Sequence, residues 1–169
     1  MMKKSENAYD WLGAGYYFWQ SNYKRALDFA QHPPGKRRYD APAVLGAVVS
    51  LHNCLDLSDN NYIDLVRLSY QNLKRMCEED GTELPENKNV PGSNDRVLRE
   101  LDCRVVENVH EMIAAMEGPP FDSVRGVFTE GGLLYDGAGF YEKTHIQICI
   151  RNPNCIKGFF LPRGEASWP

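Results

Sequence analysis

Apolar residues recur at helical spacing in three segments of the chain. The first follows Ser21 or Asn22, either of which can cap a helix, and it stops before Pro33. The second runs over 61–77, and the third, which is the clearest, runs over 96–116. Their apolar stripes are Tyr23, Ala26, Leu27 and Ala30, then Ile63, Val66, Tyr70, Leu73 and Met76, then Leu98, Leu101, Val105, Val109, Met112 and Met116. The pattern therefore predicts three amphipathic helices.

Five other segments have the composition of strands, namely 15–19, 43–51, 124–129, 145–151 and 156–161. The segment 43–51 is rich in valine and leucine with little polarity, which predicts a central strand buried on both faces. A β-then-α start, an α-rich middle and a β-rich end predict an α+β fold. We expect 1–169 to form a single domain, because the length suits one domain and 43% of the residues are apolar.

The composition argues against several classes of protein. The net charge is −4, with 19 basic and 23 acidic residues, which argues against a surface built throughout to grip nucleic acid. No apolar run approaches the ~20 residues of a membrane span, and we expect no signal peptide at the polar start. The five cysteines are widely spaced and form no C-x-x-C pair. We therefore expect reduced thiols, no metal site, no membrane association and a cytoplasmic location.

A glycine pair followed by aromatic residues is the most distinctive stretch of the chain. It reads Gly13-Ala14-Gly15-Tyr16-Tyr17-Phe18. Glycine lets a ligand approach the main chain closely, and alternation along a strand puts Tyr17 on the face opposite Tyr16 and Phe18. An aromatic ring exposed beside such a turn would suit a planar ligand. The alternative interpretation is an ordinary strand with large buried side chains.

This stretch resembles the glycine-x-glycine-x-tyrosine-phenylalanine segment of the poly-ADP-ribose polymerase type of ADP-ribosyltransferase. The segment 144–153 resembles the last signature strand of small bacterial members of that superfamily. The resemblance implies an ADP-ribosyltransferase-like split β-sheet core with an α-helical middle segment, NAD as the cofactor and transfer of ADP-ribose to a macromolecule. It also implies a bacterial toxin or defence setting, in which the target is a protein or a nucleic acid. Tyr17 falls on the tyrosine that stacks on the nicotinamide ring in that family.

The same resemblance suggests the other residues of the site. Gln147 falls where the family has its glutamate, and its amide can accept a hydrogen bond from a ribose hydroxyl but carries no charge. Glu130, at the mouth of the expected substrate loop 130–143, is the nearest carboxylate that could compensate, and His145 shares a strand face with Gln147. The expected catalytic residues are Tyr17, Gln147, Glu130 and His145. The expected cofactor-binding residues are Gly13, Gly15, Tyr17, Phe29 and Arg151.

The histidine strand that precedes the tyrosine segment in relatives has no counterpart here, because the chain starts too close to Asp10. Either the domain is N-terminally truncated, or this member lacks the usual cofactor anchor. In both cases we expect weak NAD binding and slow transfer. We also expect an uncovered sheet edge through which a homo-oligomer could form.

Two alternative functions stay open. The chain could be a catalytically degraded binding or interaction protein on the same fold, which the neutral Gln147 favours. It could also be a phosphotransferase acting on RNA ends, for which Arg125, Arg151 and His145 are the candidate phosphate ligands. The NAD hypothesis makes two structural predictions: the Tyr17 ring lies open in a cleft, and the glycine-rich loop 131–143 is the most mobile loop beside it.

Overall fold

The computed structural model describes residues 2–33, 38–89, 95 and 97–163, which form a mixed α+β fold. In chain order the elements are β1 (Tyr16–Trp19), α1 (Tyr23–Gln31), β2 (Gly46–Val49), β3 (Cys54–Asp56), α2 (Asn60–Asp80), β4 (Asn87–Lys88), β5 (Leu98–Arg99), α3 (Glu100–Ala115), β6 (Ser123–Phe128), β7 (His145–Ile150), a 3₁₀ turn (Pro153–Cys155) and β8 (Ile156–Phe160). The predicted α+β class and the existence of the three helices are confirmed.

A four-stranded sheet in the order β1-β7-β6-β3 organises the fold. β7 lies antiparallel to both β1 and β6, and β3 lies parallel to β6. The register pairs Tyr17 with Cys149 and Trp19 with Gln147. The glycine–tyrosine segment and the segment 144–153, which lie far apart in the sequence, are therefore on neighbouring strands.

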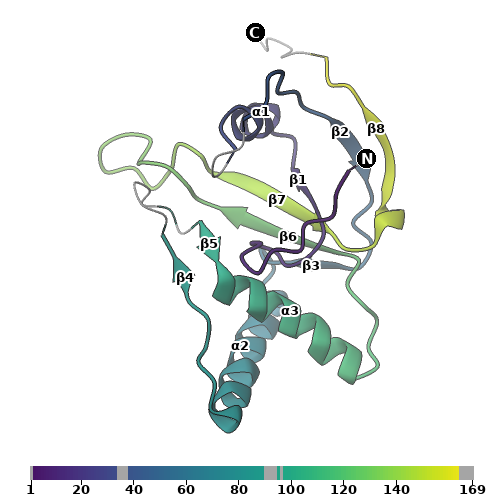
Figure 1. Ribbon diagram of the computed structural model, residues 1–169, viewed down its shortest axis with the longest axis vertical. Helices are drawn as coiled ribbons and strands as arrows, with labels where there is room; N and C mark the ends of the chain where they lie inside the picture. Colours follow the sequence, from purple (N-terminus) through teal and green to yellow (C-terminus); the bar gives the residue numbers. More distant parts are fainter. Residues whose placement is uncertain (1, 34–37, 90–94, 96, 164–169) are drawn as a thin grey trace.

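Each face of this sheet has its own core. On one face, α3 contributes to a buried cluster made of Leu12, Leu55, Val106, Val109, Phe121, Val124, Phe128 and Cys149. On the other face, the β2–β8 pair covers a smaller cluster of Ile148, Ile150 and Cys155, with Tyr16, Phe18, Val49, Leu51 and Ile156 packed around it. Figure 1 shows α2 and α3 together on one side of the molecule and the β2–β8 pair on another. The predicted alternation along β1 is confirmed, because Tyr16 and Phe18 contact the smaller cluster and Tyr17 contacts the larger one.

The helix ends follow from the local sequence. The Asn22 side chain caps α1 by accepting a hydrogen bond from Arg25 N at 2.9 Å, and Asp59 caps α2 by accepting one from Asn61 N at 2.8 Å. Gly81 ends α2 at a φ of +66°, a left-handed conformation that favours glycine. Within the described ranges, no helix combines the length and apolar character needed to cross a bilayer.

A buried polar clamp joins α2 to α3. Ser69 Oγ donates to the Val105 carbonyl at 2.8 Å, and Asn108 Nδ2 donates to the carbonyl and hydroxyl oxygens of Ser69 at 3.0 and 2.9 Å. Both polar side chains are buried. Because a buried polar group without a partner is costly, these bonds fix the position of one helix against the other.

Some predicted elements differ from the structure. The prediction of a central strand over 43–51 is wrong, because only Gly46–Val49 is a strand, it pairs with β8 alone, and Val48 is 57% exposed. The place beside β6 belongs to β3, which at three residues is too short to show a periodic pattern. The third helix begins at Glu100 and not at 96, because Leu98 and Arg99 pair with β4.

We expect Ser69→Ala to lower the free energy of unfolding by about 1–3 kcal/mol, because Asn108 and the Val105 carbonyl each lose a buried partner. Gln71→Ala, at an exposed position of the same helix, is the matched control and should change it by less than about 0.5 kcal/mol. Urea unfolding followed by circular dichroism measures both variants. Equal unfolding midpoints for the two would contradict the role of the clamp.

Candidate functional site

The structure divides most of the predicted site residues between two clusters on the α3 face of the sheet. We call the first the Glu107 cluster, which comprises Glu107, Arg151 and the turn 13–15. We call the second the Glu130 cluster, which comprises Arg25, Glu130, His145 and Gln147. The two clusters differ in what their polar groups contact, and this difference decides which of them can take a ligand.

Glu107 of α3 ties the turn 13–15 to the end of β7. Its Oε1 accepts from Ala14 N at 2.6 Å and from Arg151 Nη1 at 2.7 Å, and its Oε2 accepts from Arg151 Nη2 at 3.1 Å. Arg151 Nη1 also donates to the Ala14 carbonyl at 3.2 Å. Burial alone would raise the pKa of Glu107, but the hydrogen bonds from Arg151 and Ala14 outweigh burial and lower it. Arg151 is thus engaged by an internal carboxylate.

Packing accounts for both glycines of the motif. Gly13 has a φ of +76°, and a Cβ at this position would lie 2.4 Å from Glu107 Oε1. A Cβ on Gly15 would lie 2.4 Å from Cys149 Sγ and 2.7 Å from the Ile150 carbonyl oxygen. The glycine pair is therefore explained by close contact with α3 and β7, without a ligand.

The prediction that the Tyr17 ring lies open in a cleft is wrong. The ring packs against the core cluster on the α3 face. Its hydroxyl donates to the Gly13 carbonyl at 2.7 Å and accepts from Leu12 N at 2.9 Å. Burial raises the pKa of Tyr17. The side chain thus satisfies the backbone of the turn instead of presenting its ring to a ligand.

In the Glu130 cluster, a buried carboxylate is paired with a guanidinium and lies next to an imidazole. Glu130 Oε2 accepts from Arg25 Nη2 at 2.6 Å and lies 3.5 Å from His145 Nδ1. Glu130 is 7% exposed and His145 is 4% exposed. Arg25 Nη1 also donates to Asp28 at 3.1 Å. The cluster therefore joins α1, the end of β6 and the start of β7.

His145 acts as a neutral hydrogen-bonding group in this cluster. Its Nδ1 lies 2.7 Å from the Lys143 carbonyl, and because a carbonyl only accepts, Nδ1 carries the hydrogen. Its Nε2 then accepts from Gln147 Nε2 at 3.1 Å. Burial lowers the pKa of His145, which keeps the imidazole uncharged at neutral pH. The amide oxygen is the group of Gln147 that is left to accept from a ligand.

Aromatic rings border the Glu130 cluster. Trp19, opposite Gln147 on β1, packs against Phe29 of α1 with ring centroids 4.9 Å apart. Phe29 is 41% exposed, so it offers an accessible ring among the predicted cofactor-binding residues. The Trp11 ring lies 6.2 Å from the His145 ring. The cluster thus combines buried charge with flat apolar surfaces.

Two buried donors in this region, Trp19 Nε1 and Arg25 Nε, have no hydrogen-bond partner among the described residues. A buried donor without an acceptor destabilises a protein by about 1–3 kcal/mol. A ligand that brings oxygen acceptors, such as ribose hydroxyls or phosphate, would relieve this cost. These residues therefore fit the polar part of a nucleotide, whereas the turn 13–15 and Tyr17 do not.

The remaining candidates do not converge on one site. Arg125 pairs with Asp56 at 2.9 Å and alternates along β6 with Val124, so it lies on the face opposite the two clusters. Arg151 is engaged by Glu107, so the three candidate phosphate ligands Arg125, Arg151 and His145 do not converge as the phosphotransferase alternative requires. The described residues contain no group of three or more His, Cys, Asp or Glu side chains that could hold a metal ion, and all five cysteines are free thiols.

The loop 130–143 borders the candidate site. It begins at Glu130, and its last residue, Lys143, accepts from His145 through the main chain and lies 3.8 Å from Asp28 through its ammonium group. A bridge between Leu133 and Tyr141 closes the loop internally. The sequence analysis predicted that this loop lies beside the site, and these contacts are consistent with that position. The mobility of the loop stays a prediction.

Sequence reasoning missed Arg25 and Glu107, which hold the two clusters together. Both lie on amphipathic helices, where a charged residue ordinarily faces solvent. The one available signal was the position of Glu107 between Val106 and Asn108, in the most apolar part of the third helix. Arg25 follows the glycine–tyrosine segment in the longer form of the resemblance, but no role in the site was predicted for it.

We expect Tyr17→Phe to lower the free energy of unfolding by about 1–3 kcal/mol, because Leu12 N and the Gly13 carbonyl lose their buried partner. Tyr16→Phe, on the opposite face of β1, is the control and should cost less than about 0.5 kcal/mol. Chemical denaturation of the two variants measures the difference. If Tyr17→Phe proves as stable as the wild type, the hydroxyl does not support the turn.

We expect Glu107→Gln to destabilise the protein by about 1–3 kcal/mol at pH 7, because Arg151 loses its carboxylate. The pKa of Glu107 is lowered in the folded state, so its contribution is complete above the unfolded value of about 4.3 and is lost as the pH falls through the folded pKa. The difference in unfolding free energy between wild type and variant should therefore shrink below about pH 4.

Glu111→Gln is the control for that measurement, because Glu111 also forms a two-bond pair with an arginine of α3 but lies on the exposed surface. It should cost less than about 1 kcal/mol. A pH-independent difference for Glu107→Gln would show that the charge of Glu107 is not what stabilises the turn.

Comparison with known proteins leaves the family of this chain open. No model of a known protein family matches it, and no curated protein or solved structure is significantly similar to it.

Proposed function

We propose that this chain is an ADP-ribosyltransferase-like domain with the split β-sheet core of that fold, and that it binds NAD and transfers ADP-ribose to a macromolecule. The proposed setting is a bacterial toxin or defence protein of the cytoplasm. Because β1 lies at an edge of the four-stranded sheet, association of two copies along this strand is part of the proposal.

The antiparallel pairing of β1 with β7 is the observation that carries the proposal. It sets the two segments that resemble the superfamily side by side, with Trp19 opposite Gln147. It also places Gln147 and His145 on the face where Glu130 accepts from Arg25. Three of the four expected catalytic residues thus lie in one cluster, although they come from separate parts of the sequence.

The groups of the Glu130 cluster support the proposed reaction. NAD supplies an ADP-ribosyl group whose bond to nicotinamide breaks as positive charge develops on the ribose. Glu130 would stabilise that charge, since a carboxylate in a buried site acts more strongly than in water. His145 would orient the Gln147 amide through its Nε2, and Gln147 would accept from a ribose hydroxyl through its amide oxygen. Phe29, and not Tyr17, offers the accessible ring for a planar group.

The loop between β6 and β7 suits a macromolecular target. Figure 1 shows it extending beyond the ends of these strands. Its exposed large apolar side chains are Leu133, Leu134, Tyr135, Phe140 and Tyr141. Clusters of exposed apolar side chains commonly mark interaction surfaces. We therefore propose that the target, a protein or a nucleic acid, contacts this loop next to Glu130.

A non-catalytic binding protein on the same fold is the second candidate, and the Arg25–Glu130 pair favours it. The carboxylate is engaged at 2.6 Å by a cation whose side chain is 14% exposed. The residue in the family's glutamate position is the neutral Gln147. A site of this kind could bind the nucleotide and fail to transfer it.

Titration of the purified chain with NAD by calorimetry, followed by a label-transfer assay on bacterial extract, tests the proposal. We expect binding weaker than micromolar and slow labelling. Glu130→Gln should lower the labelling rate about a hundredfold and change NAD affinity little, because the charge acts on the transition state. Phe29→Ala should weaken NAD binding.

The controls separate the two candidates. Glu78→Gln, at an exposed position near the end of α2 and outside the cluster, should leave both measurements unchanged. NAD binding without any labelling would favour the binding protein. The absence of NAD binding would contradict both candidates, and loss of labelling by Tyr17→Phe without loss of stability would show that Tyr17 contacts the ligand.

A further inference from the structure

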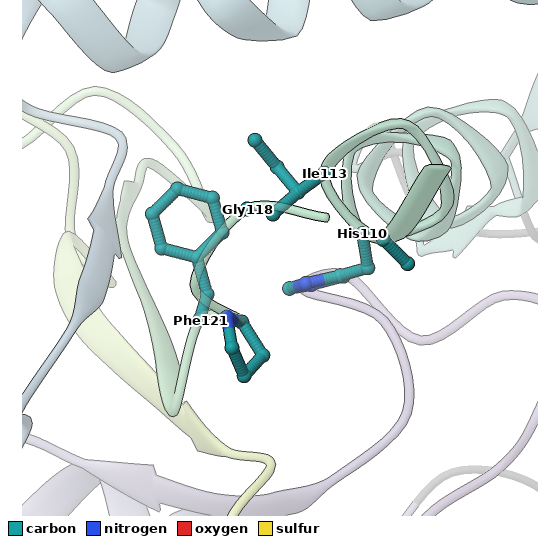
Figure 2. A pocket seen from close by; sticks show the side chains of 6 residues that line it. His110, Ile113, Gly118 and Phe121 are labelled. Carbon is teal, nitrogen blue, oxygen red and sulfur yellow. The ribbon is translucent and has the colours of Figure 1, made fainter. Parts of the chain in front are cut away.

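A small cavity lies at the C-terminal end of α3, away from the Glu130 cluster. It has a volume of about 260 Å³ and is lined by His110, Ile113, Ala114, Gly118, Pro120 and Phe121. Figure 2 shows the His110 imidazole projecting from α3 toward the segment that carries Phe121. The walls come from one helix and from the loop that leads into β6, and the space is partly open to solvent at Ala114 and Pro120.

The imidazole of His110 is the one polar side chain in this lining. Its Nε2 is buried and has no hydrogen-bond partner among the described residues. Burial lowers the pKa of His110 to about 4, so the ring is neutral at physiological pH and has one N–H to donate and one nitrogen to accept. An unpartnered buried nitrogen of this kind requires an explanation, which an occupant of the cavity would supply.

The other walls are flat and apolar. Phe121 is buried and meets His110 edge to face, with ring centroids 6.0 Å apart and an interplanar angle of 76°. The Pro119 and Pro120 carbonyls both accept from Asn53 Nδ2, at 3.3 and 2.9 Å, so the loop is held in position. The cavity is therefore a preformed slot between aromatic, aliphatic and proline surfaces.

Water suits this slot poorly. An ordered buried water usually makes about three hydrogen bonds, whereas His110 is the one polar side chain of this mostly apolar lining. A cavity of about 150 Å³ is large enough for benzene. A ring with a single polar substituent would fill the apolar space and satisfy the imidazole at the same time.

We propose that this cavity binds a small aromatic molecule that carries one hydrogen-bonding group, of the size and polarity of a phenol, with His110 as its polar anchor. The apolar body of the ligand lies against Ile113 and Phe121, and its polar group meets the imidazole. This site is independent of the proposed NAD site, because none of its lining residues belongs to the Glu130 cluster.

Titration of the full ¹⁵N-labelled chain with phenol, monitored by NMR, tests the proposal, and toluene serves as the comparison of equal size without a hydroxyl. We expect saturable shifts of residues 110–121 with a dissociation constant of roughly a millimolar, as suits so small a ligand. Phenol should bind more tightly than toluene by roughly two- to tenfold, the range for one hydrogen bond. His110→Leu should abolish that preference.

Two neighbouring alanines of α3 give a matched pair of variants. Ala114 lines the cavity and Ala115 does not, and both are exposed, so a larger side chain at either position leaves the core intact. Ala114→Phe should block binding of both probes, and Ala115→Phe should leave it unchanged. Absence of saturable binding to the wild type, equal affinity for phenol and toluene, or undiminished binding to Ala114→Phe would each overturn the proposal.

Discussion

The hydrogen bonds of the Glu107 carboxylate are the interactions on which the packing of α3 against the turn 13–15 and the end of β7 most depends. Through one side chain they join α3 to Arg151 after β7 and to the main chain of Ala14. The Glu107–Arg151 pair is partly buried, and removing one partner of such a pair leaves a charge that is incompletely compensated by solvent. The turn 13–15, the strand that follows it and the helix above it are therefore positioned together.

This constraint changes how the glycine–tyrosine segment is interpreted. A ligand-binding turn needs an open main chain, whereas here Gly13 and Gly15 are glycines because α3 and β7 approach too closely for a Cβ. The Tyr17 hydroxyl forms hydrogen bonds with the main chain of the same turn, at Leu12 and Gly13. The Glu130 cluster is therefore the better candidate site, because its charged and polar groups are buried and two donors in its region, on Arg25 and Trp19, have no acceptor among the described residues.

The elements with a strong local period could be predicted from the sequence, and the contacts between them could not. The helices over α1 and α2 and the alternation of Tyr16 and Tyr17 follow from spacing alone. The segment 43–51 misleads because an apolar run looks the same whether it lies inside a sheet or covers one. The Arg25–Glu130 pair joins residues 105 positions apart, and no local pattern encodes such a distance.

The same ion pair limits what the candidate site can accept. Glu130 is buried, so a ligand that displaced Arg25 without bringing positive charge would leave the carboxylate unpaired, at a cost of about 3–5 kcal/mol. A neutral ring or an anionic phosphate cannot replace the guanidinium at Glu130. Under the proposed function, the positive charge that develops on the ribose as its bond to nicotinamide breaks would take the place of the guanidinium, and Arg25 would then be available to phosphate oxygens. The Arg25–Glu130 ion pair would thus be exchanged for two others as the reaction proceeds.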